Sequence, residues 1–268
     1  HISSQYISGL MMALCVLPDD SEIEILTRLE SEPYVEMTRE VMDAFGVRTD
    51  KTDKGYRVPG NQEPMRMEPF EAEPDCSQAA FWHVANYLGA SIEVRDIPLK
   101  SVQGDAQIVN ILEALRAFSL SEEDETDESE FVIDASQIPD LIPVLSVACA
   151  GTPCTVKIIN AQRLKIKESD RLSASHEMLT RLGVSVELTG EGMVIYGRDK
   201  HFEKALFRAC SIDSYSDHRI VMAASVAALF ADGPVAISDF RAVDKSYPAF
   251  FRDFRRMGGI ADEFNMGE

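Results

Sequence analysis

The chain has 268 residues, of which 45% are hydrophobic, and a formal net charge of −19. This length and composition suffice for one large globular domain or two ordinary ones. The acidic balance argues against a nucleic-acid partner, because binding to a phosphate backbone depends on clustered Lys and Arg. No apolar run approaches the roughly 20 residues that span a bilayer, and residues 1–5 lack a signal-peptide pattern, so we expect a cytoplasmic protein without a membrane partner. An anionic small molecule would need a local concentration of cations against this acidic background.

The cysteines lie in apolar stretches without the paired CxxC spacing that is typical of zinc sites. They therefore predict buried free thiols and no metal site. The five are Cys15, Cys76, Cys149, Cys154 and Cys210.

Helical apolar patterns that end in glycine recur along the chain, and short β-rich stretches follow them. Such glycines are typical of helix C-termini, and alternation of apolar residues is typical of strands. The expected glycine-ended helices are 38–46, 76–89, 173–183 and 250–258, the further helices 6–14, 108–115 and 220–229, and the strands 91–94, 155–159, 184–188, 193–196 and 235–237.

This alternation predicts an α/β protein that is assembled from similar modules. A domain boundary is expected near Glu68–Pro74, where two prolines and several charges separate two groups of elements. The alternative interpretation of that segment is a surface loop.

The first candidate for chemistry is the segment Lys167-Glu168-Ser169-Asp170-Arg171, which opens a predicted helix. The helix dipole alone explains Glu168 and Asp170 in a first turn. Lys167 and Arg171 are four residues apart and repel each other on one helix face unless an anion or a carboxylate lies between them. This spacing favours an anion site.

The second candidate is Ser216-Asp217-His218-Arg219, immediately before an apolar helix. Ser216 or Asp217 is a natural N-cap. His218 and Arg219 are unfavourable at a helix N-terminus when charged, so they indicate a phosphate or carboxylate drawn by free backbone N–H groups.

Two further segments are weaker. Lys245 precedes a helix whose first turn suits Pro248, and a surface lysine is the plainer interpretation. Ser3-Ser4-Gln5 enters another helix, where Ser3 or Ser4 is a simple N-cap.

Taken together and in order, these segments resemble the EPSP synthase family over nearly the whole chain. The matching segments are SSQYISGLMMAL, SEPYVEMTREVMDAFGV, QGD, IPDLIPVL, KESDRL, SDHRIVMAA and DKSYP. The combination of KESDR, DHR and the KSYP lysine is specific, whereas each alone is weak. The resemblance implies transfer of the enolpyruvyl group of phosphoenolpyruvate to the 5-hydroxyl of shikimate 3-phosphate with release of phosphate, without a metal or an organic cofactor.

The resemblance also implies roles for individual residues. Asp140 would contact the shikimate hydroxyls and take part in proton transfer, Glu168 would be the proton-transfer carboxylate, and Lys245 would protonate the departing phosphate. The implied contacts to shikimate 3-phosphate are Ser3, Ser4, Gln5, Ser31, Tyr34, Asp140 and Lys167, and those to phosphoenolpyruvate are Lys167, Arg171, Arg219 and Lys245. His218 is a further catalytic candidate. Arg163 stands where some relatives have Asn or Glu, so no contact is carried over to it.

The fold that the resemblance implies is an inside-out α/β barrel, with two domains each built from three βαβαββ modules. Residues 1–73 would be the last part of an incomplete first domain, and residues 74–268 the C-terminal domain. The family begins about a domain earlier with further substrate-binding residues, which are not found in this sequence. We therefore expect an active site that needs an N-terminal segment, and exposed apolar edges that promote association.

Two alternatives remain open at this stage. A UDP-N-acetylglucosamine enolpyruvyl transferase would share fold and chemistry, but its catalytic cysteine in a mobile loop has no counterpart in the context of Cys76. A non-catalytic fragment would retain the anion site and turn nothing over.

Overall fold

The computed structural model describes residues 4–98, 101–121, 130–198 and 205–264. Helices and strands alternate along it, which confirms the predicted α/β class. Two compact units can be distinguished. The first comprises His1–Pro74, Asp96–Ala106 and Ser136–Ile138, and the second comprises Asp75–Arg95, Gln107–Ala135 and Pro139–Glu268. The division into the consecutive segments 1–73 and 74–268 stays a prediction. None of the described helices is long and apolar enough to cross a membrane.

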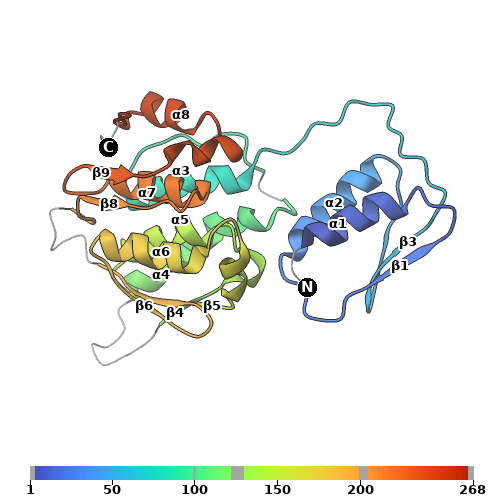
Figure 1. The fold of residues 1–268 in the computed structure, drawn as a ribbon, viewed down its shortest axis with the longest axis horizontal. Coiled ribbons are helices and arrows are strands. Elements are labelled where there is room, and N and C mark those ends of the chain that lie inside the picture. Colours follow the sequence, from blue (N-terminus) through green and yellow to red (C-terminus); the bar gives the residue numbers. More distant parts are fainter. Residues whose placement is uncertain (1–3, 99–100, 122–129, 199–204, 265–268) are drawn as a thin grey trace. The chain divides into compact units, whose positions relative to one another are not determined.

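The first unit packs two helices on a small antiparallel sheet (Figure 1). Its elements are α1 (Ser4–Leu14), β1 (Ser21–Glu24), α2 (Glu32–Ala44), β2 (Asp50–Thr52) and β3 (Gly55–Val58). The strands are ordered β1-β3-β2. The core between helices and sheet is formed by Met11, Cys15, Val35, Met42, Val47, Tyr56 and Val58.

The second unit contains two sheets. One is ordered β4-β5-β7-β6, with β4 and β5 parallel and the other neighbours antiparallel, and the second pairs β8 with β9 in parallel. Its helices are α3 (Cys76–Leu88), α4 (Ile108–Leu120), α5 (Ile142–Ala150), α6 (Arg171–Arg181), α7 (His218–Ala228) and α8 (Phe250–Arg256). Its strands are β4 (Phe131–Asp134), β5 (Thr155–Ile159), β6 (Ser185–Leu188), β7 (Met193–Tyr196), β8 (Cys210–Ile212) and β9 (Val235–Ile237).

Four 3-10 turns complete the described elements. η3 (Gln162–Ile166) leads from β5 toward α6, and η4 (Phe240–Lys245) leads from β9 toward α8. η1 (Gly104–Gln107) and η2 (Ala135–Gln137) lie where the chain passes between the two units.

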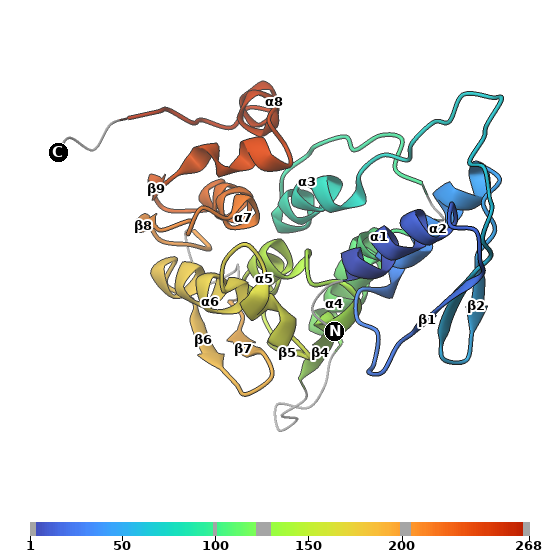
Figure 2. The ribbon, with the colours of Figure 1, turned by 45° about the vertical axis from the view of Figure 1, so that its right-hand side comes forward.

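Two buried helices, α5 and α7, occupy the inside of the second unit. Every residue of α5 is buried, because this helix is apolar on all sides. In α7 ten of the eleven residues are buried, and most of them are apolar. α5 packs against α3, α6 and α7. The four-stranded sheet covers α5 and α6 from outside, as Figures 1 and 2 both show. The described strands form open sheets rather than a closed barrel.

One βαβαββ module is complete in the second unit, as β4-α5-β5-α6-β6-β7. The first unit follows the same order from its first helix onward, as α1-β1-α2-β2-β3. Its sheet order β1-β3-β2 also repeats β5-β7-β6, with antiparallel pairing throughout. The expectation of repeated modules is thus confirmed for these two segments.

All four glycine-ended helices are present. Gly46 follows α2 with φ 75°, and Gly183 follows α6 with φ 82°, in the left-handed region that favours glycine. A Cβ on Gly183 would lie 2.8 Å from Cδ of Arg208, so close packing adds a second reason for glycine there.

Two local expectations are wrong. Residues 91–94 form no strand. The side-chain amide of Asn86 donates to the Ile92 carbonyl and accepts from the Ile92 N–H, at 2.7 Å each, so these two backbone groups cannot pair with a neighbouring strand. Pro248 lies before α8 rather than in its first turn, since Ala249 is the N-cap residue. Among the cysteines, Cys15, Cys76 and Cys149 are buried as free thiols, whereas Cys154 and Cys210 are only half-buried.

Candidate functional site

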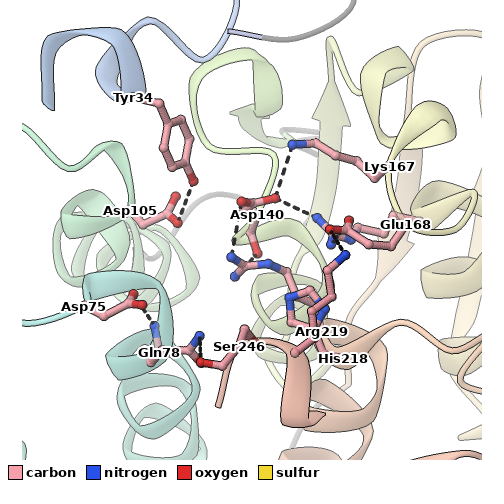
Figure 3. A network of polar contacts seen from close by, with 12 residues as sticks. Tyr34, Asp75, Gln78, Asp105, Asp140, Lys167, Glu168, His218, Arg219 and Ser246 are labelled. Atoms are coloured by element: carbon pink, nitrogen blue, oxygen red, sulfur yellow. Dashed lines mark hydrogen bonds and ion pairs between the residues drawn. The ribbon is translucent and has the colours of Figure 1, made fainter. Parts of the chain in front are cut away.

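Seven charged residues of the second unit form one connected ion cluster, shown in part in Figure 3. We call these seven residues the ion cluster. Three of its members are carboxylates and four are cations. They are Asp140, Glu168, Asp217, Lys167, Arg171, Arg219 and Lys245.

Helix starts position most of the cluster. Arg171 is the first residue of α6, and Asp170 caps that helix by accepting from the Ser173 N–H at 3.1 Å. Asp217 is the N-cap of α7 and accepts from the Arg219 N–H at 2.9 Å. Lys245 is the last residue of η4. Each side chain therefore leaves a defined end of an element.

Arg171 is the hub of the cluster, and its side chain is only 1% exposed. Its guanidinium donates to Asp217 at 2.8 Å, to Asp140 at 2.6 Å and to Glu168 at 2.5 Å. The planar fork of arginine suits such multiple contacts to carboxylates. Burial opposes its charged form, but Asp140 and Asp217 raise the pKa of Arg171 above its ordinary value.

Asp140 lies between three cations. Besides Arg171, it accepts from Arg219 Nη2 at 3.2 Å, and Lys167 Nζ lies 3.4 Å from its Oδ1. Arg219 Nη1 also donates to the main-chain carbonyl of Asp140 at 3.1 Å. Three positively charged groups thus surround this carboxylate and offset its charge.

Glu168 joins the loop of Lys245 to α6. Lys245 Nζ donates to Glu168 Oε1 at 2.8 Å, while the second carboxylate oxygen accepts from Arg171. Burial opposes ionisation, but the Lys245 hydrogen bond and the Arg171 charge outweigh it and lower the pKa of Glu168 to about 2. In this state Glu168 is a weak base.

His218 lies beside the cluster and is 4% exposed. Burial and the neighbouring Arg219 charge lower its pKa to about 4, so the imidazole is neutral at physiological pH. Its Nδ1 is 3.8 Å from Asp217 Oδ1 and, like Arg219 Nε, is buried without a hydrogen-bond partner among the described residues.

The cluster has one more cation than carboxylates, while the whole chain carries −19. Lys167 and Lys245 keep 24% and 57% of their side chains exposed, so their remaining donors face outward. A locally positive site with accessible donors on an acidic protein suits a small anion such as a phosphate or a carboxylate.

The sequence-predicted residues of the second unit are therefore brought together. Asp140, Lys167, Glu168, Arg219 and Lys245 share one network, as does Arg171. All four donating contacts of Arg171 go to carboxylates, so a direct contact with phosphoenolpyruvate would require one of them to break. That contact stays a prediction.

The other predicted contacts lie in the first unit. Ser4 is buried at the start of α1, and Gln5 follows it in exposed position. Ser31, buried and left-handed at φ 56°, is the N-cap of α2, and Tyr34 on that helix donates to Asp105 at 3.2 Å. Ser3 lies outside the described residues. Their binding roles stay predictions.

Arg163 lies half-buried in η3, in the segment that leads to Lys167. No role is assigned to it.

Two residues of these networks were missed as site residues. Asp217 was foreseen only as a helix cap, yet it is fully buried and binds the hub arginine. The signal in the sequence that indicates such a role is a capping carboxylate followed directly by a histidine and an arginine. Asp105, in the QGD segment, is 2% exposed and accepts a hydrogen bond from the Tyr34 hydroxyl. Nothing in the surrounding sequence indicates that Asp105 is a site residue.

Solved structures identify the fold. Two structures of EPSP synthase from Acinetobacter baumannii each give a TM-score of 0.78, at 21% and 20% identity, and the first covers 96% of this chain and 61% of that protein. The enolpyruvyl transferase NikO from Streptomyces tendae gives a TM-score of 0.63 at 16% identity, covering 94% of this chain and 60% of that protein. The fold is thus that of the enolpyruvyl transferases.

Sequence comparison identifies the family. The profile of EPSP synthase (3-phosphoshikimate 1-carboxyvinyltransferase) matches residues 1–254. The 3-phosphoshikimate 1-carboxyvinyltransferases of Clostridium acetobutylicum and Clostridioides difficile are 42% and 39% identical over the whole chain, which spans 62% and 61% of their lengths. This chain belongs to the EPSP synthase family.

Proposed function

We propose that this chain carries the proton-transfer groups and the phosphoenolpyruvate-binding cations of a 3-phosphoshikimate 1-carboxyvinyltransferase. The reaction transfers the enolpyruvyl group of phosphoenolpyruvate to the 5-hydroxyl of shikimate 3-phosphate and releases phosphate. One observation carries the proposal: Asp140 and Glu168 lie in one network with the cations Lys167, Arg219 and Lys245. The expected cytoplasmic location belongs to the same proposal.

The addition step requires a base and an acid. Asp140 accepts the proton of the attacking hydroxyl while the oxygen bonds to the central carbon of phosphoenolpyruvate. The methylene carbon takes a proton from the Glu168–Lys245 pair, whose two groups are 2.8 Å apart and share a hydrogen bond. In the elimination step that carbon returns a proton to the Glu168–Lys245 pair, and the electron pair of the broken C–H bond re-forms the carbon–carbon double bond. The bond from the central carbon to the phosphate oxygen breaks at the same time, and Lys245 donates a proton to the departing phosphate.

The cations hold the anionic groups of the substrate. Lys167 and Arg219 are paired with Asp140, and Lys245 is paired with Glu168. A bound phosphate or carboxylate competes with these carboxylates for the same donors. Withdrawing Lys245 from Glu168 would remove a cause of its lowered pKa and make it a better proton acceptor.

The contacts to shikimate 3-phosphate from Ser4, Gln5, Ser31 and Tyr34, and the contact of Arg171 to phosphoenolpyruvate, belong to this proposal as predictions. Ser4 and Ser31 support it as hydroxyls at the starts of two neighbouring helices, α1 and α2. Hydroxyls and backbone N–H groups at helix N-termini are suited to bind a phosphate.

The test is phosphate release from shikimate 3-phosphate and phosphoenolpyruvate, with Glu168→Gln as the variant. The chain spans only 61–62% of its relatives' lengths, so the assay is run alone and with the part of the Clostridium acetobutylicum protein that it does not match. We expect Glu168→Gln to lower the rate on the order of 10²–10³-fold, the range for loss of one charge-stabilising group. Glu187→Gln on the exposed face of β6 is the matched control and should retain full activity.

A second measurement separates this function from anion binding alone. Titration calorimetry with phosphoenolpyruvate reports the cation site whether or not turnover occurs. Binding without phosphate release in either assay would support the non-catalytic alternative. Release that is insensitive to Glu168→Gln would contradict the assigned role. UDP-N-acetylglucosamine, the acceptor of the rival transferase, serves as a third substrate, and the names of the matched relatives do not favour it.

A further inference from the structure

The turn that precedes α7 has an unusual backbone. Tyr215 and Ser216 both lie in the left-handed region, with φ 53° and 54°, and the Asp217 N–H donates to the Ser214 carbonyl at 2.9 Å. These are the features of a type I′ turn, whose central positions are normally Asn or Gly. A tyrosine and a serine there cost free energy, and such strain persists only where the surroundings hold it in place.

Hydrogen bonds on both sides hold this turn. The Tyr215 N–H donates to Asp213 Oδ1 at 2.9 Å, and the Ser214 N–H donates to Ser238 Oγ at 3.1 Å. The Tyr215 hydroxyl reaches α6, where it donates to Glu177 Oε2 at 2.5 Å.

The turn is consequently attached to α6 at two points. Asp217 binds Arg171 at the first residue of α6, and Tyr215 binds Glu177 six residues further along the same helix. At 1.5 Å per residue these points are roughly 9 Å apart along the helix axis. The Ser214–Ser238 bond and the buried helix α7 also hold the turn, and the Tyr215–Glu177 bond adds a second attachment to α6 that restricts rotation about the Asp217–Arg171 contact.

We propose that Tyr215 is a positioning residue, whose bond to Glu177 holds the strained turn against α6 and thereby fixes Asp217 on the hub Arg171. The orientation of Arg171 in turn sets Asp140 and Glu168, which it binds directly. The consequence for turnover rests on the proposed function, and the consequence for Arg171 does not.

The hydroxyl can be removed without disturbing the core. Tyr215 is 44% exposed, so Tyr215→Phe opens no cavity and the variant should fold. Tyr196 on β7 is the matched control, because it is also exposed and its hydroxyl also bonds a glutamate, Glu187. A merely structural loss of one surface hydrogen bond would affect both variants alike.

The direct readout is exchange of the Arg171 Nε–H with solvent, measured by NMR on the ligand-free chain. This proton is buried and donated to Asp217, so it should exchange slowly. We expect Tyr215→Phe to accelerate its exchange on the order of threefold to tenfold, as the loss of one hydrogen bond implies. Tyr196→Phe should leave it unchanged. Equal exchange in Tyr215→Phe and the unmodified chain would overturn the proposal.

A conservative pair of substitutions tests the acceptor. Glu177→Gln retains a side-chain oxygen for the Tyr215 hydroxyl, whereas Glu177→Ala does not. We expect Glu177→Ala to reproduce the faster exchange of Tyr215→Phe, and Glu177→Gln to stay near the unmodified value. Equal exchange in the two variants would also contradict the proposal.

Titration with phosphoenolpyruvate then separates the two proposals. A threefold to tenfold weaker affinity in Tyr215→Phe, together with faster Arg171 exchange, is the expected result. Faster exchange in a chain that binds no phosphoenolpyruvate, either alone or with the unmatched part of the Clostridium acetobutylicum protein, would reject the proposed function and leave the positioning of Arg171 supported. Faster exchange with unchanged affinity would reject the claim that this positioning serves the site.

Discussion

Arg171 is a buried cation whose charge is balanced by side chains from distant parts of the sequence. Asp140 and Asp217 lie 31 and 46 residues away along the chain, and only Glu168 is a neighbour. Breaking a buried ion pair costs more than forming it contributes, because the remaining charge stays desolvated. The cluster is consequently expected to hold its geometry until an anion replaces one of the carboxylates.

The pKa of Glu168 leads to a prediction about acid stability. Its folded pKa of about 2 lies below the ordinary value of 4.5, so the folded state binds fewer protons than the unfolded state between these values. The ionised carboxylate therefore stabilises the fold above about pH 4.5, and this contribution is lost as the pH falls toward 2. We expect about 1–2 kcal/mol, reduced from the full linkage value because the side chain is partly exposed.

Urea unfolding of the unmodified chain and of Glu168→Gln between pH 3 and pH 6 measures this contribution. The difference in free energy of unfolding should shrink as the pH falls. His218 also destabilises the fold between about pH 6.5 and 4, where the unfolded imidazole gains a proton, but it is present in both proteins and largely cancels. A difference that does not change with pH would contradict the depressed pKa.

The sequence predicted negative charge between Lys167 and Arg171, because two cations four residues apart on one helix face repel. The reason was wrong, since Lys167 has an extended backbone after η3 and α6 begins only at Arg171, but both side chains do contact the Asp140 carboxylate. It could not show that Asp140 and Asp217 supply part of this charge. Those carboxylates come from other helix starts, and only the packing of α5, α6 and α7 brings them within reach. The same spacing of cations in the sequence is compatible with an anion-binding site and with a network of carboxylates, so the sequence alone could not distinguish the two.

At the scale of elements, two helix caps with the same side chain should respond differently to substitution. Asp75 caps α3 and accepts from the Gln78 N–H in exposed position, whereas Asp217 caps α7 and is fully buried against Arg171. Asparagine preserves a cap but not the charge. We expect Asp75→Asn to change stability by less than about 0.5 kcal/mol and Asp217→Asn to cost about 2–3 kcal/mol, because Asp217 is the fully buried carboxylate partner of Arg171.

Alanine substitutions provide the comparison in the same urea experiment. Asp75→Ala should cost about 1 kcal/mol, the typical value of an exposed N-cap. If Asp217→Asn proved as mild as Asp75→Asn, the Asp217–Arg171 pair would contribute little, and the role of Arg171 as hub would be wrong.

Helices were easier to predict than strands, for physical reasons. The helices that end at Gly46 and Gly183 have apolar spacing and a local stop signal, so neighbours in the sequence determine them. Residues 91–94 alternate as a strand should but form none, since a strand also needs a partner edge and Asn86 occupies the backbone of Ile92 instead. β8, at three residues, depends almost wholly on such pairing and was not predicted, whereas β9 coincides with the predicted strand 235–237.

At the scale of the whole molecule, the repeated module links the two units through sequence order. α1-β1-α2-β2-β3 repeats the order and strand pairing of α5-β5-α6-β6-β7. Their central helices nevertheless differ: α5 is buried on all sides, whereas α1 exposes Tyr6, Leu10 and Met12. Association was predicted through exposed apolar edges, and the exposed side chains of α1 are a further apolar surface that would promote it. Light scattering against concentration would measure the association, and a clean monomer at high concentration would contradict the prediction.

The excess of negative charge gives the last prediction. A net charge of −19 destabilises the compact state by self-repulsion, which salt screens as the Debye length falls from about 30 Å at 0.01 M to about 10 Å at 0.1 M. The ion cluster is partly buried and should be screened less. We therefore expect the Tm, measured by calorimetry, to rise with NaCl by about 2–4 °C, which corresponds to about 1 kcal/mol.

Glu113→Gln, at an exposed position of α4, reduces the net charge from −19 to −18 and should raise the Tm slightly at low salt only. A Tm that falls with salt would mean that attractive pairs outweigh the repulsion, and the acidic surface would then have to be arranged so that its charges rarely face one another.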